Sequence, residues 1–290
     1  MLDSPKTIPR LRFRQIADSD VNDVVELLTR SFAPRRGRAF WHGVMARLAA
    51  HAPPPEAPRY GYMLDDGGGP VGVVLMPSAA LPTGEVRSNV SSWCVEPAYR
   101  SYASLLITQA FRRKDVTYVN LTPVEHTRPM LQFQGYTCYA SGTFAAALAL
   151  HMFARGPRTR IVPAEATPRA SFAAYERQVL RDHAGYGCTS LWCETDARAY
   201  PFVFRLRTLK GLPCAQLVYC RDVADCVRFA APLGRYLAGR GRALLLIDAN
   251  GPIPGLVGKY FDQKMPRYFR GPQRPRLGDL AYTEIAMFGV

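Results

Sequence analysis

The stretch that decides the fold is Val95-Glu96-Pro97-Ala98-Tyr99-Arg100-Ser101-Tyr102-Ala103-Ser104-Leu105-Leu106. It closes an apolar run, Val86–Val95, that predicts a strand, and it leads into a helix expected over about residues 104–113. The turn between them is rich in small residues and carries one arginine. N–H groups at a helix N-terminus attract anions, and small side chains let a phosphate approach the backbone. Taken alone, the stretch fits an anion site or an ordinary strand-to-helix connection.

The segments on either side alternate between strand and helix patterns. Asp65–Gly69 is a turn between two apolar runs, which is a strong hairpin signal. Period-2 and helical spacings predict the remaining elements. Strands are expected at residues 11–16, 59–64, 71–76, 86–95, 117–121, 136–139 and 143–151, and helices at 21–32, 40–48, 104–113 and 129–134. This order predicts an α/β fold with a mixed, mostly antiparallel central sheet flanked by helices.

The second half of the chain repeats part of this order. A capped helix from Thr167-Pro168, a hairpin about Lys210-Gly211, a helix over residues 226–237 and a strand over 243–247 follow one another. By the same analogy, residues 259–269 are expected to correspond to 126–136, and residues 282–288 to the strand at 144–152. The sequence therefore predicts a duplicated fold, with one domain at residues 1–155 and a second at 156–290.

Composition narrows the class of protein. The 290 residues carry 37 Lys+Arg against 23 Asp+Glu, a net charge of +14 that favours anionic partners. The basic residues form only short groups, and no nucleic-acid-binding motif accompanies them, so no specific nucleic acid is expected. Apolar runs are too short to span a bilayer, and the first residues lack a secretion signal, so we expect a cytoplasmic protein with no membrane contact. Seven cysteines without metal-ligand spacing predict buried free thiols and no metal site.

The fold-deciding stretch and a later Gly-Tyr pair together resemble the GNAT superfamily of acyl-CoA N-acyltransferases. In that family the fourth strand ends in a Val-x-Pro-x-Tyr-Arg run, and a Gly-aromatic pair follows the last core helix. The matching residues are Val95, Pro97, Tyr99, Arg100 and Gly135-Tyr136. The resemblance covers about residues 10–150, and a tandem form would cover the whole chain. The sequence departs from the family pattern at its glycines, replaced by Ser101, Ala103 and Ser104, and at a tyrosine position that is Leu131.

The resemblance implies an acyltransferase that moves an acyl group, in the first instance acetyl, from CoA to an amine acceptor. The substrate that carries the acyl group would be acetyl-CoA or another acyl-CoA. A backbone N–H near Cys94 and Val95 would polarise the thioester, and Glu96, Glu125 and His126 are candidate bases. The residues expected to hold CoA are Cys94, Val95, Arg100, Ser101, Tyr102, Ala103 and Ser104.

Two other readings remain open. The first is a non-catalytic protein that keeps the fold as a ligand-binding or structural module, which the missing glycines and Leu131 favour. The second is a nonspecific nucleic-acid binder, which rests on the charge alone. The second half has no glycine between Tyr219 and the following helix, so we expect it not to bind CoA. It would shape the acceptor side, serve as structure or form a homodimer.

Overall fold

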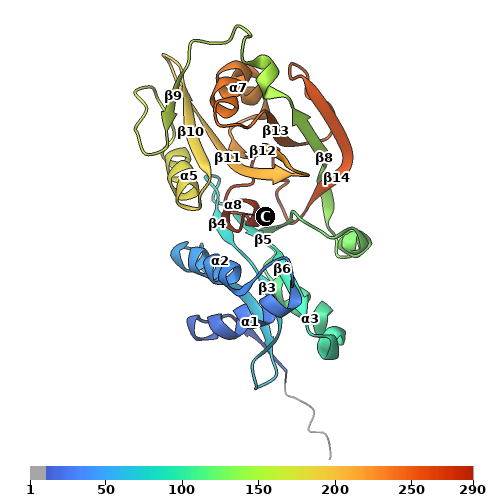
Figure 1. The fold of residues 1–290 in the computed structure, drawn as a ribbon. Coiled ribbons are helices and arrows are strands. Elements are labelled where there is room, and N and C mark those ends of the chain that lie inside the picture. Colours follow the sequence, from blue (N-terminus) through green and yellow to red (C-terminus); the bar gives the residue numbers. More distant parts are fainter. Residues whose placement is uncertain (1–10, 290) are drawn as a thin grey trace, which may run out of the picture. The chain divides into compact units, whose positions relative to one another are not determined.

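The computed structural model describes residues 11–289. Their contacts divide the chain into two compact units, Met1–Tyr118 and Val119–Val290, which are described separately below. Figure 1 shows the first unit from blue to teal and the second from green to red. Strand β7 (Val116–Asn120) contains the division between them.

The first unit is built on a small antiparallel sheet. Its strands follow the order β1-β2-β3-β6, and β4 pairs with β5 outside this sheet, where β5 neighbours β7. The elements are β1 (Arg12–Gln15), η1 (Asp18–Asp20), α1 (Val21–Ser31), α2 (Arg38–Ala50), β2 (Gly61–Asp65), β3 (Pro70–Leu75), β4 (Ser78–Ala80), β5 (Val86–Asn89), β6 (Ser91–Val95), η2 (Pro97–Tyr102) and α3 (Ala103–Ala110).

Helices flank this sheet because their apolar residues recur at helical spacing. In α1 the buried residues include Val24, Val25 and Leu28, and in α2 they include Trp41 and Leu48. Helix α1 packs against α2 and β3, whereas α3 packs against β2 and β3. In Figure 1, α1 and α2 are drawn to the left of β3 and α3 to its right. The end of β6 thus lies beside α1 and at the start of the segment that becomes α3.

The second unit is dominated by a larger mixed sheet of order β14-β8-β13-β12-β11-β10-β9. Only the β12–β13 pair among these neighbours is parallel in the described part of the chain. The elements are η3 (Glu125–Thr127), α4 (Arg128–Phe133), β8 (Thr137–Ala146), η4 (Leu148–His151), β9 (Arg160–Pro163), α5 (Ala174–Gly185), β10 (Thr189–Glu194), β11 (Ala199–Leu209), β12 (Leu212–Cys220), α6 (Val223–Arg228), α7 (Ala230–Ala238), β13 (Leu244–Ala249), β14 (Gly258–Arg270) and α8 (Glu284–Met287).

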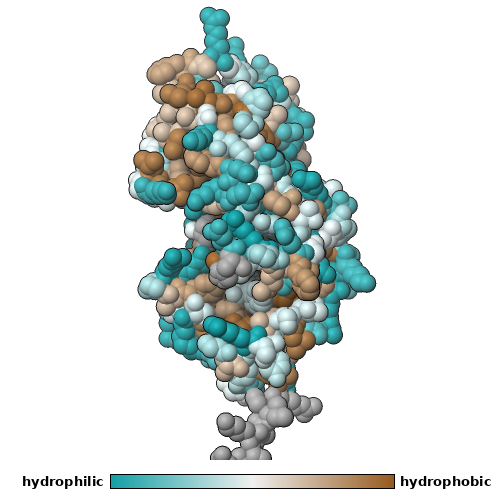
Figure 2. Space-filling view, turned by 90° about the vertical axis from the view of Figure 1, so that its right-hand side faces the viewer, coloured by the Kyte–Doolittle hydropathy of each residue, from teal (hydrophilic) through white to brown (hydrophobic). Residues whose placement is uncertain are grey.

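The core of this unit lies between the sheet and α7. Phe144, Phe202 and Phe204 from the strands meet Phe229 and Leu233 from the helical segment, and all five are buried. Large apolar side chains also remain at the surface of the unit, including Phe133 and Phe153. Figure 2 shows hydrophobic residues gathered in its upper part, over the second unit, with hydrophilic ones between them. No helix of the described residues is long and apolar enough to cross a membrane.

The predicted fold class is confirmed. Helices flank the sheets, and most neighbouring strands are antiparallel. The correspondence drawn for the end of the chain is wrong in two places. Residues 259–269, matched to a short helical segment, form β14, whose backbone pairs with β8. Residues 282–288, matched to a strand, contain α8, which begins after Thr283.

The division between the units differs from the boundary expected near residue 155. Strand β8 follows the first unit in sequence, but it hydrogen-bonds to β13 and β14 from the end of the chain. These long-range pairs assign residues 137–146 to the second unit. Pairing between segments more than 100 residues apart leaves no local signal in the sequence.

Candidate functional site

A cavity of about 390 Å³ lies in the first unit at the end of β6. Helix α1 contributes Leu27, Arg30 and Ser31 to its lining. The rest of the lining comes from the fold-deciding stretch: Cys94, Val95, Glu96, Pro97 and Arg100. Four residues predicted for the site, Cys94, Val95, Glu96 and Arg100, are therefore brought together around one cavity.

Strand β6 contains a β-bulge just before this cavity. Val73 pairs with Cys94 and Leu75 pairs with Ser91, so three steps along β6 match two along β3. Ser92 accommodates the extra residue with a φ of 52°, in the left-handed region. Separately from this bulge, the expected strand Val86–Val95 is split into β5 and β6 near Val90.

The open edge of β6 presents a backbone donor. The Glu96 N–H donates to the Val71 carbonyl oxygen over 2.8 Å. In an antiparallel ladder, successive N–H groups point alternately toward and away from the partner strand. The Val95 N–H therefore points away from β3, toward an edge where no further strand pairs with β6 in the described residues. Such a free donor can polarise a carbonyl group.

The segment after β6 is helical earlier than the sequence predicted. A 3-10 helix, η2, begins at Pro97 and continues directly into α3, whereas the helix was expected from about Ser104. Proline favours the first helical position. Every residue from Ala98 to Ser104 carries a Cβ, which favours helical over positive-φ conformations. The expected open loop at residues 99–104 is accordingly a helix entrance.

The helix entrance separates the residues that were predicted to bind CoA. Arg100 lines the cavity, and no ion pair to it is found within residues 11–289. Ser101, Tyr102 and Ser104 are exposed and Ala103 is half-buried, and none of the four lines the cavity. Their binding role stays a prediction.

Glu96 and Arg30 form an ion pair at the rim of the cavity. Arg30 Nη2 lies 2.8 Å from Glu96 Oε1, and the Glu96 side chain is 33% exposed. A second hollow of about 410 Å³ also has Arg30 and Glu96 in its lining, together with Asp23, Glu26 and Asp66. The ion pair orients Glu96, the predicted base. Both of its residues line the two cavities.

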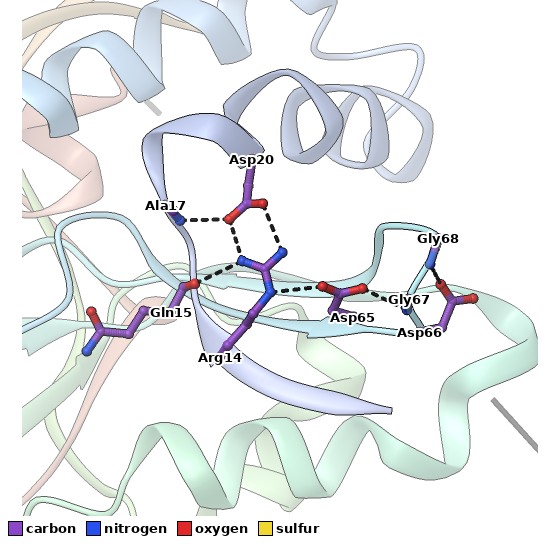
Figure 3. A network of polar contacts seen from close by, with 8 residues as sticks. All are labelled: Arg14, Gln15, Ala17, Asp20, Asp65, Asp66, Gly67 and Gly68. Atoms are coloured by element: carbon purple, nitrogen blue, oxygen red, sulfur yellow. Dashed lines mark hydrogen bonds and ion pairs between the residues drawn. The ribbon is translucent and has the colours of Figure 1, made fainter. Parts of the chain in front are cut away.

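A polar network fixes the turn that faces η2. Tyr99 Oη donates to Asp66 Oδ2 over 2.6 Å, which raises the pKa of Tyr99 and lowers that of Asp66. The neighbouring Asp65 accepts Arg14 Nε at 2.8 Å, and Arg14 also holds Asp20 at 2.6 Å. Figure 3 shows Arg14 between these two carboxylates, with Asp65 and Asp66 also accepting glycine N–H groups of the turn. The network joins β1, the start of α1 and the β2–β3 turn.

Cys94 is not a nucleophile in this arrangement. Burial raises the pKa of the thiol to about 11, although a hydrogen bond with Ser31 lowers it. The neutral thiol therefore predominates at physiological pH, and the thiolate is the nucleophilic form. Cys94 instead lines the cavity as a neutral side chain.

The other predicted base lies in the second unit. His126 belongs to η3, and its side chain is outside the part of the structure that is described. Glu125 precedes it and is exposed. Leu131, which stands where the family has a tyrosine, is buried in α4 and has no proton to donate. The roles of His126 and Glu125 stay predictions.

The second unit has a strand-to-helix junction between β12 and α6, but its own side chain occupies the helix terminus. Asp222 caps α6 by accepting the Ala224 N–H at 2.8 Å. A carboxylate at this position repels an anion and uses the donor that a phosphate would need. This junction is therefore less favourable to a phosphate than an uncapped helix terminus, and the expectation that this half does not bind CoA stays a prediction.

The sequence reasoning missed the contribution of α1. Leu27, Arg30 and Ser31 are spaced i, i+3 and i+4, so they share one side of the helix. This spacing was readable in the sequence, but a polar pair on a helix is usually solvated. Only the contact between α1 and β6 shows that Arg30 and Ser31 belong to the cavity.

Comparison with solved structures places the chain in the GNAT-like fold class. Similar structures include GCN5-related N-acetyltransferases from Kribbella flavida (TM-score 0.55, 14% identity, 90% of this chain and 70% of that one) and Anabaena variabilis (0.54, 10%, 90% and 72%). A protein from Pyrococcus horikoshii described as a "putative acetyltransferase" matches over 97% of this chain and 96% of its own, with a TM-score of 0.55 and 12% identity. At these identities the likeness shows the fold. No family model matches the sequence, and no curated protein does.

Proposed function

We propose that this protein transfers an acyl group, in the first instance acetyl, from CoA to an amine. The observation that carries the proposal is the bulged end of β6, where the outward-pointing Val95 N–H stands beside a cavity lined by Arg30, Glu96 and Arg100. The GNAT-like fold supports it. We further propose that residues 1–155 form the acyl-CoA-binding region and that the rest is acceptor-side or structural.

The thioester is already activated, so the protein has to position the reactants and move one proton. The thioester carbonyl would accept a hydrogen bond from the Val95 N–H, which stabilises the oxyanion as the amine attacks. The amine nitrogen bonds to the carbonyl carbon and the C–S bond breaks. Glu96 takes the proton from the amine, and the departing thiolate takes a proton from water to give free CoA.

In this proposal Arg100 binds the CoA phosphates. It lines the cavity at the helix entrance, and arginine is suited to phosphate because its guanidinium donates paired hydrogen bonds. The positive end of the η2–α3 segment adds to this attraction. The net charge of +14 also favours an anionic substrate.

Substitution of Val95 tests the proposal most directly. Val95→Pro removes the outward N–H without removing a ladder hydrogen bond, because that N–H faces the unpaired edge. We expect release of CoA thiol from acetyl-CoA, measured with a thiol reagent and an amine panel, to fall by about 10²–10³-fold. Val95→Ala keeps the N–H and serves as the matched control. Equal rates for the two variants would contradict the assignment.

The alternative is an acyl-CoA-binding protein without transfer. It is favoured by the helical residues 98–104, which offer fewer free N–H groups than an open loop, and by Leu131. Calorimetric titration with acetyl-CoA at low salt separates the two. Binding without thiol release from any amine supports the alternative, and absence of binding by a folded protein contradicts both.

A further inference from the structure

A cavity of about 530 Å³ lies in the second unit, at the edge of its sheet. The edge is formed by β9 and β10, which pair antiparallel and lie side by side in Figure 1. The lining comes from residues 158–160, 169–170 and 194–196. Its volume is in the range of small-molecule sites, and it shares no lining residue with the cavity at the end of β6.

A buried carboxylate ties these three segments together. The Glu194 side chain is 6% exposed, and its Oε2 accepts Arg160 Nε at 2.7 Å. Its Oε1 accepts the backbone N–H groups of Arg169 and Ala170, the second at 2.8 Å. Burial alone would raise the pKa of Glu194, but the Ala170 N–H and Arg160 lower it overall. Glu194 is therefore ionised at neutral pH, and Arg160 compensates its charge.

Two further arginines line the cavity with their charges uncompensated. The side chains of Arg158 and Arg169 are exposed, and neither guanidinium forms an ion pair or a hydrogen bond within residues 11–289. The position of Arg169 is nevertheless fixed, because Glu194 holds its backbone N–H. The guanidinium group donates paired hydrogen bonds to phosphate oxygens. Two such groups around one cavity favour an anion that carries more than one charge.

The rest of the lining indicates what else the ligand carries. Asp196 is exposed and lines the cavity, and no partner for its carboxylate is found in the described part of the chain. A carboxylate accepts hydrogen bonds from hydroxyl groups and repels a second anionic group. None of the described residues that line the cavity is aromatic, so a nucleobase would have no ring on which to stack. The lining therefore favours one phosphate joined to a neutral, hydroxyl-bearing body.

We propose that this cavity binds the phosphate monoester of a sugar or polyol. The phosphate oxygens accept hydrogen bonds from Arg158 and Arg169, and a ligand hydroxyl donates to the Asp196 carboxylate. Arg160 stays with Glu194 and keeps the lining in place. The site uses no residue of the acyl-transfer cavity and does not depend on that function.

Calorimetric titrations of the full chain at low salt test the proposal with four probes. Glucose 6-phosphate carries both required groups, inorganic phosphate lacks the hydroxyl-bearing body, glucose lacks the phosphate, and AMP carries a base. We expect glucose 6-phosphate to saturate at millimolar concentration or below, and inorganic phosphate to bind at least about threefold more weakly. Glucose should not saturate, and AMP should bind no more tightly than inorganic phosphate.

Arginine variants locate the binding. Arg158→Gln and Arg169→Gln should each weaken glucose 6-phosphate binding by about tenfold or more, because each removes a charged hydrogen-bond donor. Arg155→Gln removes an exposed arginine outside the lining and should leave the affinity unchanged. Arg100→Gln should also leave it unchanged, which separates this site from the proposed CoA site in the first unit. All four positions are exposed or line a cavity rim, so thermal unfolding should stay near that of the wild type.

Asp196→Ala separates the two parts of the ligand. It should lower the affinity for glucose 6-phosphate to that for inorganic phosphate, and it should not weaken inorganic phosphate itself, since a repelling charge is removed. Three results would overturn the proposal. They are no binding of glucose 6-phosphate, tighter binding of AMP than of glucose 6-phosphate, and glucose 6-phosphate binding that is lost in Arg100→Gln but kept in Arg158→Gln and Arg169→Gln.

Discussion

At the scale of single residues, a buried ion pair inside the second unit has a large effect on stability. Arg267 Nε and Nη2 lie 2.9 and 3.0 Å from the two Asp248 oxygens, and both side chains are almost fully buried. Arg267 Nη1 also donates to the Leu121 carbonyl. Removal of one partner from such a pair leaves an uncompensated charge.

We expect Arg267→Met to lower the free energy of unfolding by about 3–5 kcal/mol. The double variant Arg267→Met/Asp248→Leu should recover much of this loss, because no buried charge remains. Urea denaturation followed by circular dichroism measures both. If the double variant is as unstable as the single one, the loss comes from packing and not from the charge.

Arg14 forms ion pairs in the first unit, but unlike Arg267 its side chain is half-exposed. It joins Asp20 and Asp65, and its side chain is 37% exposed, so solvent and salt weaken the interaction. We expect Arg14→Gln to lower the free energy of unfolding near pH 7 by about 1–2 kcal/mol, as a charged hydrogen-bond network at a partly exposed site does. Arg12→Gln, on the same strand, is the control for loss of charge alone.

The same network predicts a dependence on pH. The Arg14 hydrogen bond lowers the pKa of Asp20 in the folded protein. Burial alone would raise the pKa of Asp65, but the Gly67 N–H and Arg14 lower it overall. A lowered pKa contributes stability that is present above the unfolded value of about 3.9 and is lost as pH falls through the folded value.

The stability difference between wild type and Arg14→Gln should therefore be full near pH 6 and shrink steadily below about pH 4. Denaturation curves at several pH values would show it. A difference that stays constant down to pH 2 would mean that the carboxylates do not respond to Arg14.

At the scale of elements, the bulge in β6 determines where the strand points its donors. Ser92 has a φ of 52°, which β-branched residues adopt only with strain. We expect Ser92→Val to lower the free energy of unfolding by about 1–2 kcal/mol, while Ser92→Asn stays close to wild type because asparagine tolerates this conformation. Ser92→Val should also weaken acetyl-CoA binding, measured by calorimetry. Equal stability of the two variants would argue against the bulge.

The junctions that follow β6 and β12 differ in a way that matters for binding. The first enters its helix without a side-chain cap, and the second is capped by Asp222. Removal of a cap typically costs about 1 kcal/mol. Asp222→Ala should therefore lower stability by about that amount, and it should not change acetyl-CoA binding, since α6 lies in the other unit.

At the scale of the whole molecule, the two units differ in what they offer an acyl-CoA. In the first unit a bulged strand end, a cavity and a helix entrance without a side-chain cap occur together at the end of β6. We expect acetyl-CoA to saturate at about one equivalent per chain, in wild type and in Asp222→Ala alike. Saturation at two equivalents would show that the second unit also binds the substrate.

The two units also depend on long-range pairing to different extents. Strand β8 pairs with β13 and β14, which are separated from it by about 100 residues of sequence. Such contacts carry a larger loop-closure entropy than the local hairpins of the first unit. These long-range strand pairs explain why the boundary between the units could not be inferred from amino-acid composition or from proline and glycine positions.

The sequence by itself determined the local elements of the first unit, the fold class and the group Cys94, Val95, Glu96 and Arg100, because these follow from period, turn chemistry and a contiguous motif. The tertiary structure alone decided the rest. It split Val86–Val95 near Val90 and placed a bulge in β6, made residues 98–104 helical, added Arg30 and Ser31 from α1, and turned residues 259–269 into a strand. Each depends on a partner distant in sequence or on a backbone angle that no local pattern encodes.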